Sequence, residues 1–216
     1  MAASERVTTD DEIVVRDLKR DDCRAAGEVL ARSHREDPAF GTVYRDPVVR
    51  LRALTLVFEQ WCLDGVEHGR VDALRVCDRL AGVAVWFPPD SFPPTIGRQL
   101  RFAPGYLPVA RVAPRSFPRL LRYGARAARL HPRGRKWYLA IVGLDDGFRG
   151  RGLGARLLER GLRRADDQEL PCYLETAKRR NVDWYRWLGF FVSDPAVQLV
   201  PRGPTHWMMW RPPEAA

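Results

Sequence analysis

The sharpest pattern of apolar and polar residues lies towards the C-terminus. An uninterrupted apolar run over residues 137–144 predicts a buried central strand. Four leucines between residues 153 and 162 recur at helical spacing, which predicts an amphipathic helix at Gly152–Asp166 after a loop at Asp145–Arg151. The shorter segments that follow predict a strand at Cys172–Thr176, a helix at Val182–Leu188 ended by Gly189, and strands at Phe190–Val192 and Thr205–Trp210.

The N-terminal part gives weaker signals of the same kind. Its pattern predicts a short strand at Ile13–Arg16, followed by a helix that Asp21 or Asp22 caps. A long helix is predicted at Pro47–Glu67, because proline suits the first helical turn. Two further strands, which form a hairpin around Asp78-Arg79, are predicted at Val71–Cys77 and Leu80–Phe87.

Residues 88–135 interrupt this pattern with many prolines and arginines. Apolar residues persist, and helical pieces are predicted at Ile96–Phe102 and Phe117–Leu130. Because the segment is too long for a plain loop, we interpret it as a helical insertion or lid before the central strand. Residues 1–11 are predicted to be a loose tail, and residues 1–216 to form a single mixed α/β domain built on one sheet.

The chain has 36 basic and 27 acidic residues, a net charge of +9 that suggests an anionic partner. However, only three of the basic residues are lysines, and the arginines are spread along the whole chain. This bias is typical of a GC-rich coding sequence, so the composition does not favour nucleic acid as a partner.

The four cysteines lie far apart, and none stands at metal-ligand spacing from a histidine. This predicts free thiols in a reducing compartment and no metal site. The first twelve residues are polar and acidic rather than a signal peptide, and no apolar run approaches the length of a membrane span. We therefore expect a cytoplasmic protein without a membrane partner, as a monomer or homodimer.

The segment between the central strand and the next helix predicts an anion site. Backbone N–H groups at the start of a helix are unpaired and carry partial positive charge. Glycines let a phosphate approach those donors, and arginines add charge-assisted contacts. The sequence lacks the Gly-Lys-Ser/Thr of a Walker loop and the spacing of a dinucleotide fingerprint, and a plain glycine-rich turn remains the alternative. The predicted pyrophosphate loop is Arg149-Gly150-Arg151-Gly152-Leu153-Gly154.

The pattern Arg149-x-x-Gly152-x-Gly154 after an apolar strand resembles the acetyl-CoA signature of the GNAT superfamily of N-acetyltransferases. The segments WYLAIVGL, GRGLGARLLERGL, PCYLET, NVDWYRWLGF and HWMMWR are similar to those of the puromycin N-acetyltransferase group of actinobacterial small-amine enzymes. This resemblance is close over residues 136–211, whereas over residues 13–87 only the order of elements agrees. It implies a GNAT-like, mainly antiparallel sheet flanked by helices, with acetyl-CoA as co-substrate.

The resemblance also implies roles for individual residues. The backbone of Val142–Leu144 pairs with the pantetheine arm, a backbone N–H of this strand polarises the thioester carbonyl, and Tyr185 protonates the departing thiolate. The residues implied to bind the cofactor are Val142, Gly143, Leu144, Arg149, Gly150, Arg151, Gly152, Leu153, Gly154 and Asn181. The chain departs from the family pattern at Asp145-Asp146, where a residue followed by proline is common, and at Lys178-Arg179-Arg180, where smaller residues are common.

The chemistry of acetyl transfer agrees with these roles and leaves alternatives open. Tyr185 shares a helix face with Asn181 and stays protonated at neutral pH, so it can donate a proton. The alternative is that Tyr185 is an ordinary aromatic residue between Trp184 and Trp187, which are better core candidates. Glu175, an acid within an apolar strand, is either the general base for the amine or the partner of an arginine. The rival bases are His34, His131 and His206.

The predicted function is acetyl transfer from acetyl-CoA to the amine of a small molecule, in antibiotic resistance or secondary metabolism. The alternatives are a protein or peptide N-acetyltransferase and a non-catalytic acyl-CoA-binding regulator. Residues 88–135 and the helix around Leu51–Trp61 are expected to shape the acceptor pocket. Its candidate aromatic walls are Phe92, Phe102, Tyr106, Phe117 and Tyr123.

Overall fold

The computed structural model describes residues 12–199 and 203–214, and the predicted loose tail at 1–11 lies outside them. Seven strands form one sheet in the order β1-β2-β3-β4-β5-β7-β6. All neighbours pair antiparallel except β4 and β5, which run parallel. The prediction of a mixed, mainly antiparallel sheet is thereby confirmed. The strands are β1 (Ile13–Asp17), β2 (Arg70–Val76), β3 (Arg79–Phe87), β4 (Trp137–Leu144), β5 (Cys172–Thr176), β6 (Phe191–Gln198) and β7 (Thr205–Arg211).

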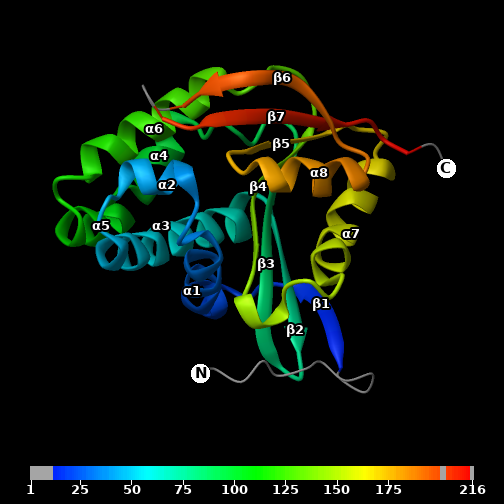
Figure 1. Ribbon diagram of the computed structural model, residues 1–216, viewed down its shortest axis with the longest axis horizontal. Coiled ribbons are helices and arrows are strands. Elements are labelled where there is room, and N and C mark those ends of the chain that lie inside the picture. Colours follow the sequence, from blue (N-terminus) through cyan, green and yellow to red (C-terminus); the bar gives the residue numbers. More distant parts are fainter. Residues whose placement is uncertain (1–11, 200–202, 215–216) are drawn as a thin grey trace.

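Helices cover both faces of this sheet (Figure 1). Helices α1 to α6 lie on one face, and α7 and α8 lie on the other. The helices are α1 (Cys23–His34), α2 (Pro38–Val43), α3 (Pro47–His68), α4 (Ile96–Phe102), α5 (Leu107–Val112), α6 (Phe117–Leu130), α7 (Leu153–Asp166) and α8 (Arg179–Trp187), with single 3-10 turns at η1 (Arg20–Asp22), η2 (Ala103–Tyr106) and η3 (Asp146–Phe148).

Two apolar cores follow from this layering. Leu54 and Phe58 of α3 are fully buried against the first face, and Leu157 and Leu158 of α7 against the second. Truncating such a leucine to alanine typically costs about 2–5 kcal/mol, because a cavity remains. The helical spacing of the α7 leucines therefore marks the face that fixes this helix on the sheet.

Local chemistry explains where the long helix α3 begins. Pro47 occupies its first turn, and the Asp46 carboxylate accepts the backbone N–H groups of Val48 at 2.8 Å and Val49 at 2.9 Å. Asp22 occupies the N-cap position of α1, as one of the two predicted candidates, but its side chain does not cap the helix. Asp22 makes no capping bond, because its carboxylate accepts a hydrogen bond from Arg75 on β2 at 2.8 Å and the turn η1 leads into the helix instead.

The hairpin between β2 and β3 turns one residue earlier than predicted. Cys77 and Asp78, rather than Asp78 and Arg79, occupy the turn, with φ values of 47° and 62°. Both residues with positive φ suit the turn that joins tightly paired strands. Arg79 consequently belongs to β3.

The segment 88–135 is mostly helical. Helices α4 and α6 have the predicted bounds, whereas η2 and α5 were not predicted. Buried Val109 and partly buried Phe117 and Leu120 pack the segment against the core beside α3. None of the helices in the described ranges is long and apolar enough to cross a membrane.

Candidate active site

The parallel strands β4 and β5 meet at only one end. Within the described residues they pair at Trp137 with Cys172 and at Tyr138 with Tyr173, although β4 runs on to Leu144 and β5 to Thr176. Beyond Tyr138, the β4 edge that faces β5 therefore makes no strand pairs with it. Such an edge offers N–H and C=O groups to an extended ligand.

A bulge in β4 lies at the start of this free edge. Val85 of β3 pairs with Ile141 and Trp86 pairs with Leu139, so Ala140 has no partner in β3. Consequently Ala140 and Ile141 both pack towards the core under α1 and α3, where a regular strand would alternate. The bulge leaves backbone groups near Ala140 outside the ladder, which suits an anion or carbonyl ligand.

The loop after β4 has the geometry expected of an anion site. Gly150 and Gly152 both adopt φ of 73°, a conformation that side chains disfavour. Gly152 is the N-cap of α7 and has no side chain to cap the first turn, while buried Leu153 anchors the helix start in the core. A Cβ atom on Gly154 would lie 2.9 Å from the Trp184 ring, so this glycine permits the close packing of α7 on α8.

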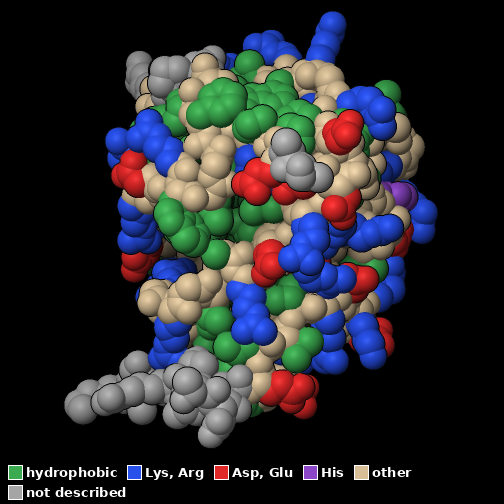
Figure 2. Space-filling view, turned by 90° about the vertical axis from the view of Figure 1, so that its right-hand side faces the viewer, with side chains coloured by type: hydrophobic (Ala, Val, Ile, Leu, Met, Phe, Trp, Pro, Cys, Tyr) green, Lys and Arg blue, Asp and Glu red, His purple; other side chains and the backbone are tan. Residues whose placement is uncertain are grey.

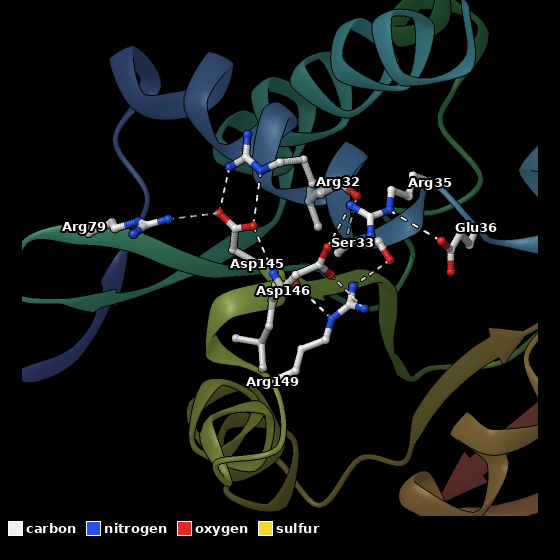
Figure 3. A network of polar contacts seen from close by, with 10 residues as sticks. Arg32, Ser33, Arg35, Glu36, Arg79, Asp145, Asp146 and Arg149 are labelled. Carbon is white, nitrogen blue, oxygen red and sulfur yellow. Dashed lines mark hydrogen bonds and ion pairs between the residues drawn. The ribbon is translucent and has the colours of Figure 1, made fainter. Parts of the chain in front are cut away.

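Arg149 belongs to a network that joins this loop to the end of α1 (Figure 3). Its guanidinium pairs with Asp146 at 3.0 Å and donates to the Ser33 carbonyl at 2.9 Å. Arg35 pairs with the other carboxylate oxygen of Asp146 at 2.9 Å. The Arg149 side chain is thus held beside the loop rather than extended into solvent.

Asp145 makes the second connection between the loop and α1. Arg32 donates to both of its carboxylate oxygens, at 3.2 and 3.0 Å. Burial alone would raise the pKa of Asp145, but the Arg32 hydrogen bonds and charge lower it below its ordinary value. The departure from the family pattern at Asp145-Asp146 therefore ties the loop to α1 through two carboxylates.

Asn181 and Tyr185 lie on α8 as predicted. The Asn181 amide donates to the Thr176 hydroxyl at the end of β5, at 3.4 Å. Tyr185 is buried between Trp184 and Phe190, and burial, assisted by Asp37, raises its pKa above the ordinary value. The expectation that Trp187 is a core residue is wrong, because this side chain is 72% exposed.

Glu175 lies on the opposite face of the sheet from α8, in a buried polar cluster. The Tyr138 hydroxyl donates to its Oε2 at 2.9 Å, and His131 Nδ1 lies 3.9 Å from its Oε1. Burial raises the pKa of Glu175, and hydrogen bonds from Tyr173 and Tyr138 offset part of this shift. Within the described part of the chain no arginine pairs with Glu175, so the arginine-partner alternative is not observed.

The three candidate histidines have different surroundings. His34 is partly buried, with Nδ1 3.0 Å from the Leu30 carbonyl, and desolvation lowers its pKa to about 4. His206 Nε2 lies 3.3 Å from the Tyr123 hydroxyl. Only His131, whose side chain is 2% exposed, contacts Glu175 among the described histidines, and burial lowers its pKa to about 3.

Sequence reasoning missed one ion pair close to this region. Lys178, at the N-cap of α8, lies 3.7 Å from Asp37, whose carboxylate also accepts the Ala39 N–H at the start of α2. Burial lowers the pKa of Lys178 against the opposing effect of Asp37. The pair joins the α1–α2 connection to the β5–α8 connection. Asp37 followed by Pro38 was the available signal, because this order marks a capped helix start.

Comparisons with known proteins find acetyltransferases. Residues 110–190 match the model of the acetyltransferase (GNAT) family. Histone acetyltransferase HPA2 and related acetyltransferase from Corynebacterium glutamicum is 27% identical, with a TM-score of 0.68 over 94% of this chain and 98% of that one.

More distant solved structures share the fold. The polyamine N-acetyltransferase of Drosophila melanogaster is 18% identical, with a TM-score of 0.60 over 93% of this chain and 100% of that chain. The PaiA N-acetyltransferase of Thermoplasma acidophilum, solved in complex with coenzyme A, is 12% identical, with a TM-score of 0.60 over 93% and 99% of the two chains. The chain therefore shares the mixed α/β fold of these N-acetyltransferases, and its residues 110–190 match the GNAT family model.

Proposed function

We propose that the chain transfers the acetyl group of acetyl-CoA directly to the amine of a small molecule, such as an antibiotic or another secondary metabolite. The observation that carries this proposal is the separation of β4 and β5 next to a helix start built from glycines. The free β4 edge can pair with the amides of a pantetheine arm, and the helix start can hold a pyrophosphate. The neighbour solved with coenzyme A supports the choice of cofactor.

The cofactor would approach from the face that α7 and α8 cover. The backbone of Val142–Leu144 would pair with the pantetheine arm, and the N–H groups of Arg149–Gly154 would hold the pyrophosphate, with Asn181 beside the arm. These residues fit such a ligand because the first turn of α7 carries no side-chain cap and the loop glycines leave open space for phosphate oxygens.

The reaction needs a neutral amine, a stabilised oxyanion and a protonated leaving thiol. The amine nitrogen attacks the thioester carbon, and a backbone N–H near the β4 bulge stabilises the oxygen that becomes negative. The carbon–sulfur bond then breaks, and Tyr185 donates its hydroxyl proton to the thiolate. The raised pKa of Tyr185 keeps its hydroxyl protonated at neutral pH, although it also makes that hydroxyl a weaker acid.

Glu175 would accept the proton that the amine loses, directly or through a water molecule. A raised pKa brings a carboxylate closer to the operating pH of a general base. The need is largest for an alkyl amine like that of lysine, which is neutral only about once in several thousand molecules at pH 7. Hydrogen bonds from Tyr138 and Tyr173 hold the carboxylate in place.

The acceptor would lie on the face that residues 88–135 cover. Phe92 packs against His131 and Tyr138, with ring centroids 4.8 Å apart in both pairs, and therefore borders Glu175. Phe102 instead packs on His68. A surface hollow of about 540 Å³ does join α3 to α5, but the residues around Glu175 do not line it. We therefore place the acceptor at the Glu175 cluster, where flat apolar walls favour a small amine.

A protein amine is the second candidate acceptor, because the neighbour at 27% identity is described as a histone acetyltransferase and related acetyltransferase. The polyamine enzyme among the neighbours favours a small amine. The test is acetyl-CoA turnover, followed by thiol release, against matched panels of small amines and of peptides with free α-amino or lysine groups. Turnover confined to peptides would refute the small-amine proposal, and no turnover with either panel would favour a non-catalytic regulator.

A further inference from the structure

The net charge of the protein comes from one continuous segment. Residues 91–144 contain ten arginines and Lys136, but no aspartate or glutamate. The rest of the chain contains 25 basic and 27 acidic residues and is therefore close to neutral. Arginines occur along the whole sequence, but aspartate and glutamate are absent from this segment.

Helix α6 arranges part of this charge in a row. Arg119, Arg122, Arg126 and Arg129 follow at steps of three and four residues, which places them on one face of the helix. The row spans about 15 Å at 1.5 Å per residue. Phe117, Leu120, Tyr123 and Leu130 are partly buried and pack against the core. At about 100° per residue, Tyr123 and Leu130 lie next to Arg119 and Arg126 around the helix, so the arginine row flanks the apolar face, and Arg122 and Arg129 are its exposed members.

Arginines of α7 form ion pairs with carboxylates, whereas those of the α6 row form none in the part of the chain that the structure describes. Arg160 and Arg164 pair with buried Asp72, and Arg163 pairs with Glu159. On the α7 side of the molecule, acidic and basic side chains lie interspersed (Figure 2). Within the described residues, no carboxylate pairs with any arginine of the α6 row, and Arg126 donates to the Gln198 carbonyl at 2.7 Å.

We propose that this arginine face of α6 binds the phosphate backbone of nucleic acid. A guanidinium presents a fork of donors that matches a phosphate group, and a rigid helix holds a regular row of such forks. Apart from exposed Leu121, the large apolar side chains of α6 pack against the core, so they are not available for insertion into a membrane interface. Every aromatic side chain of residues 91–135 is at least partly buried, so no base stacking is expected and binding is independent of sequence.

The test is fluorescence anisotropy with labelled single-stranded and double-stranded 20-nucleotide DNA between 50 and 200 mM salt. Each phosphate that the protein neutralises contributes about 0.7–0.9 to the slope of log affinity against log salt. Replacing Arg119, Arg122 and Arg129 by glutamine is expected to reduce that slope by about 2–3 and affinity at 50 mM salt by at least about tenfold. Acetyl-CoA affinity, measured by calorimetry, should stay unchanged and shows that the variant is folded.

A matched control separates the arginine face from overall charge. Arg24→Gln with Arg163→Gln removes two exposed but paired arginines, and Arg122→Gln with Arg129→Gln removes two exposed arginines of the row. Only the second pair is expected to weaken DNA binding by more than about threefold. An equal loss in both pairs, no binding by the wild type at 50 mM salt, or equal binding to polyglutamate or anionic vesicles would each overturn the proposal.

Discussion

Replacing Gly152 by aspartate is expected to abolish acetyl-CoA binding while the protein stays folded. Gly152 has φ of 73°, a conformation that costs most residues about 1–2 kcal/mol but that Asp and Asn tolerate better. No described atom lies within 4 Å of a Cβ placed there, so the change causes no clash. A carboxylate at the start of α7 also returns about 0.3–1 kcal/mol by interacting with the helix dipole. The free energy of unfolding should therefore change by less than about 1 kcal/mol.

The expected loss of binding is much larger than this loss of stability. At about 5 Å and an effective dielectric between 20 and 80, two like unit charges repel by about 0.8–3.3 kcal/mol. A pyrophosphate carries two such charges, so the repulsion is about 1.7–6.6 kcal/mol, or at least about fifteenfold in Kd.

Gly152→Asn is the matched control, because asparagine has the shape of aspartate without its charge. Calorimetry with acetyl-CoA and thermal unfolding on both variants separate charge from bulk. Binding lost only with aspartate supports phosphate on the loop. If both variants bind acetyl-CoA as tightly as the wild type, the pyrophosphate does not lie at the start of α7 and the assignment of the loop is wrong.

Three further predictions address the remaining parts of the site. Tyr185→Phe is expected to lower kcat by about 10²–10⁴-fold with little change in the KM for acetyl-CoA, and a steady-state rate within about threefold of wild type would mean that another group protonates the thiolate. The pKa of Glu175 is raised by burial, so the native carboxyl holds a proton that the unfolded chain releases, and stability falls as pH rises from 4.5 through the folded value. Glu175→Gln should therefore flatten unfolding free energy against pH over this range and remove the acidic limb of kcat/KM; an unchanged limb would exclude Glu175 as the base. Asp146→Asn removes a partly exposed anion beside the loop and is expected to tighten acetyl-CoA binding about two- to fivefold; weaker cofactor binding in this variant would mean that Asp146 orders the loop. Asp145→Asn, which breaks the half-buried pair with Arg32, should cost about 1 kcal/mol of stability.

Much of the fold could be predicted because its elements carry strong local periodicity. Strands β4 and β5 and helices α4 and α6 have the predicted bounds, because apolar runs and helical spacing mark them. Helices α2 and α5 have six residues each, too few for a period to emerge. Strand β6 extends beyond Val192, where the predicted strand ended, and past Pro195 to Gln198, because an edge strand tolerates proline and pairing with β7 holds it.

In the candidate site, too, the features that are local in sequence could be predicted and those that depend on tertiary contacts could not. The glycine loop and the Asn181–Tyr185 pair are local in sequence, and their spacing was enough to predict their placement. The environment of Glu175 depends on Tyr138 and His131, which come from another strand and from the segment after α6. The pair of Asp37 and Lys178 joins residues far apart in the chain. Contacts of this kind arise only from tertiary packing, which one sequence does not reveal.

The position of Glu175 relative to Tyr185 argues for transfer without a covalent intermediate on the protein. Successive residues of a strand point to opposite faces, and Glu175 projects to the face of α1 and α6, whereas Tyr185 lies on α8 at the other face. A base and an acid on opposite faces can serve one reaction only where the sheet is open, and β4 and β5 separate beyond Tyr138. An amine entering from the Glu175 side would then meet the thioester in this opening, while the thiolate leaves towards Tyr185. Because the amine and the thioester meet directly, with the base on one face of the sheet and the acid on the other, no nucleophilic side chain has to carry the acetyl group from the thioester to the amine.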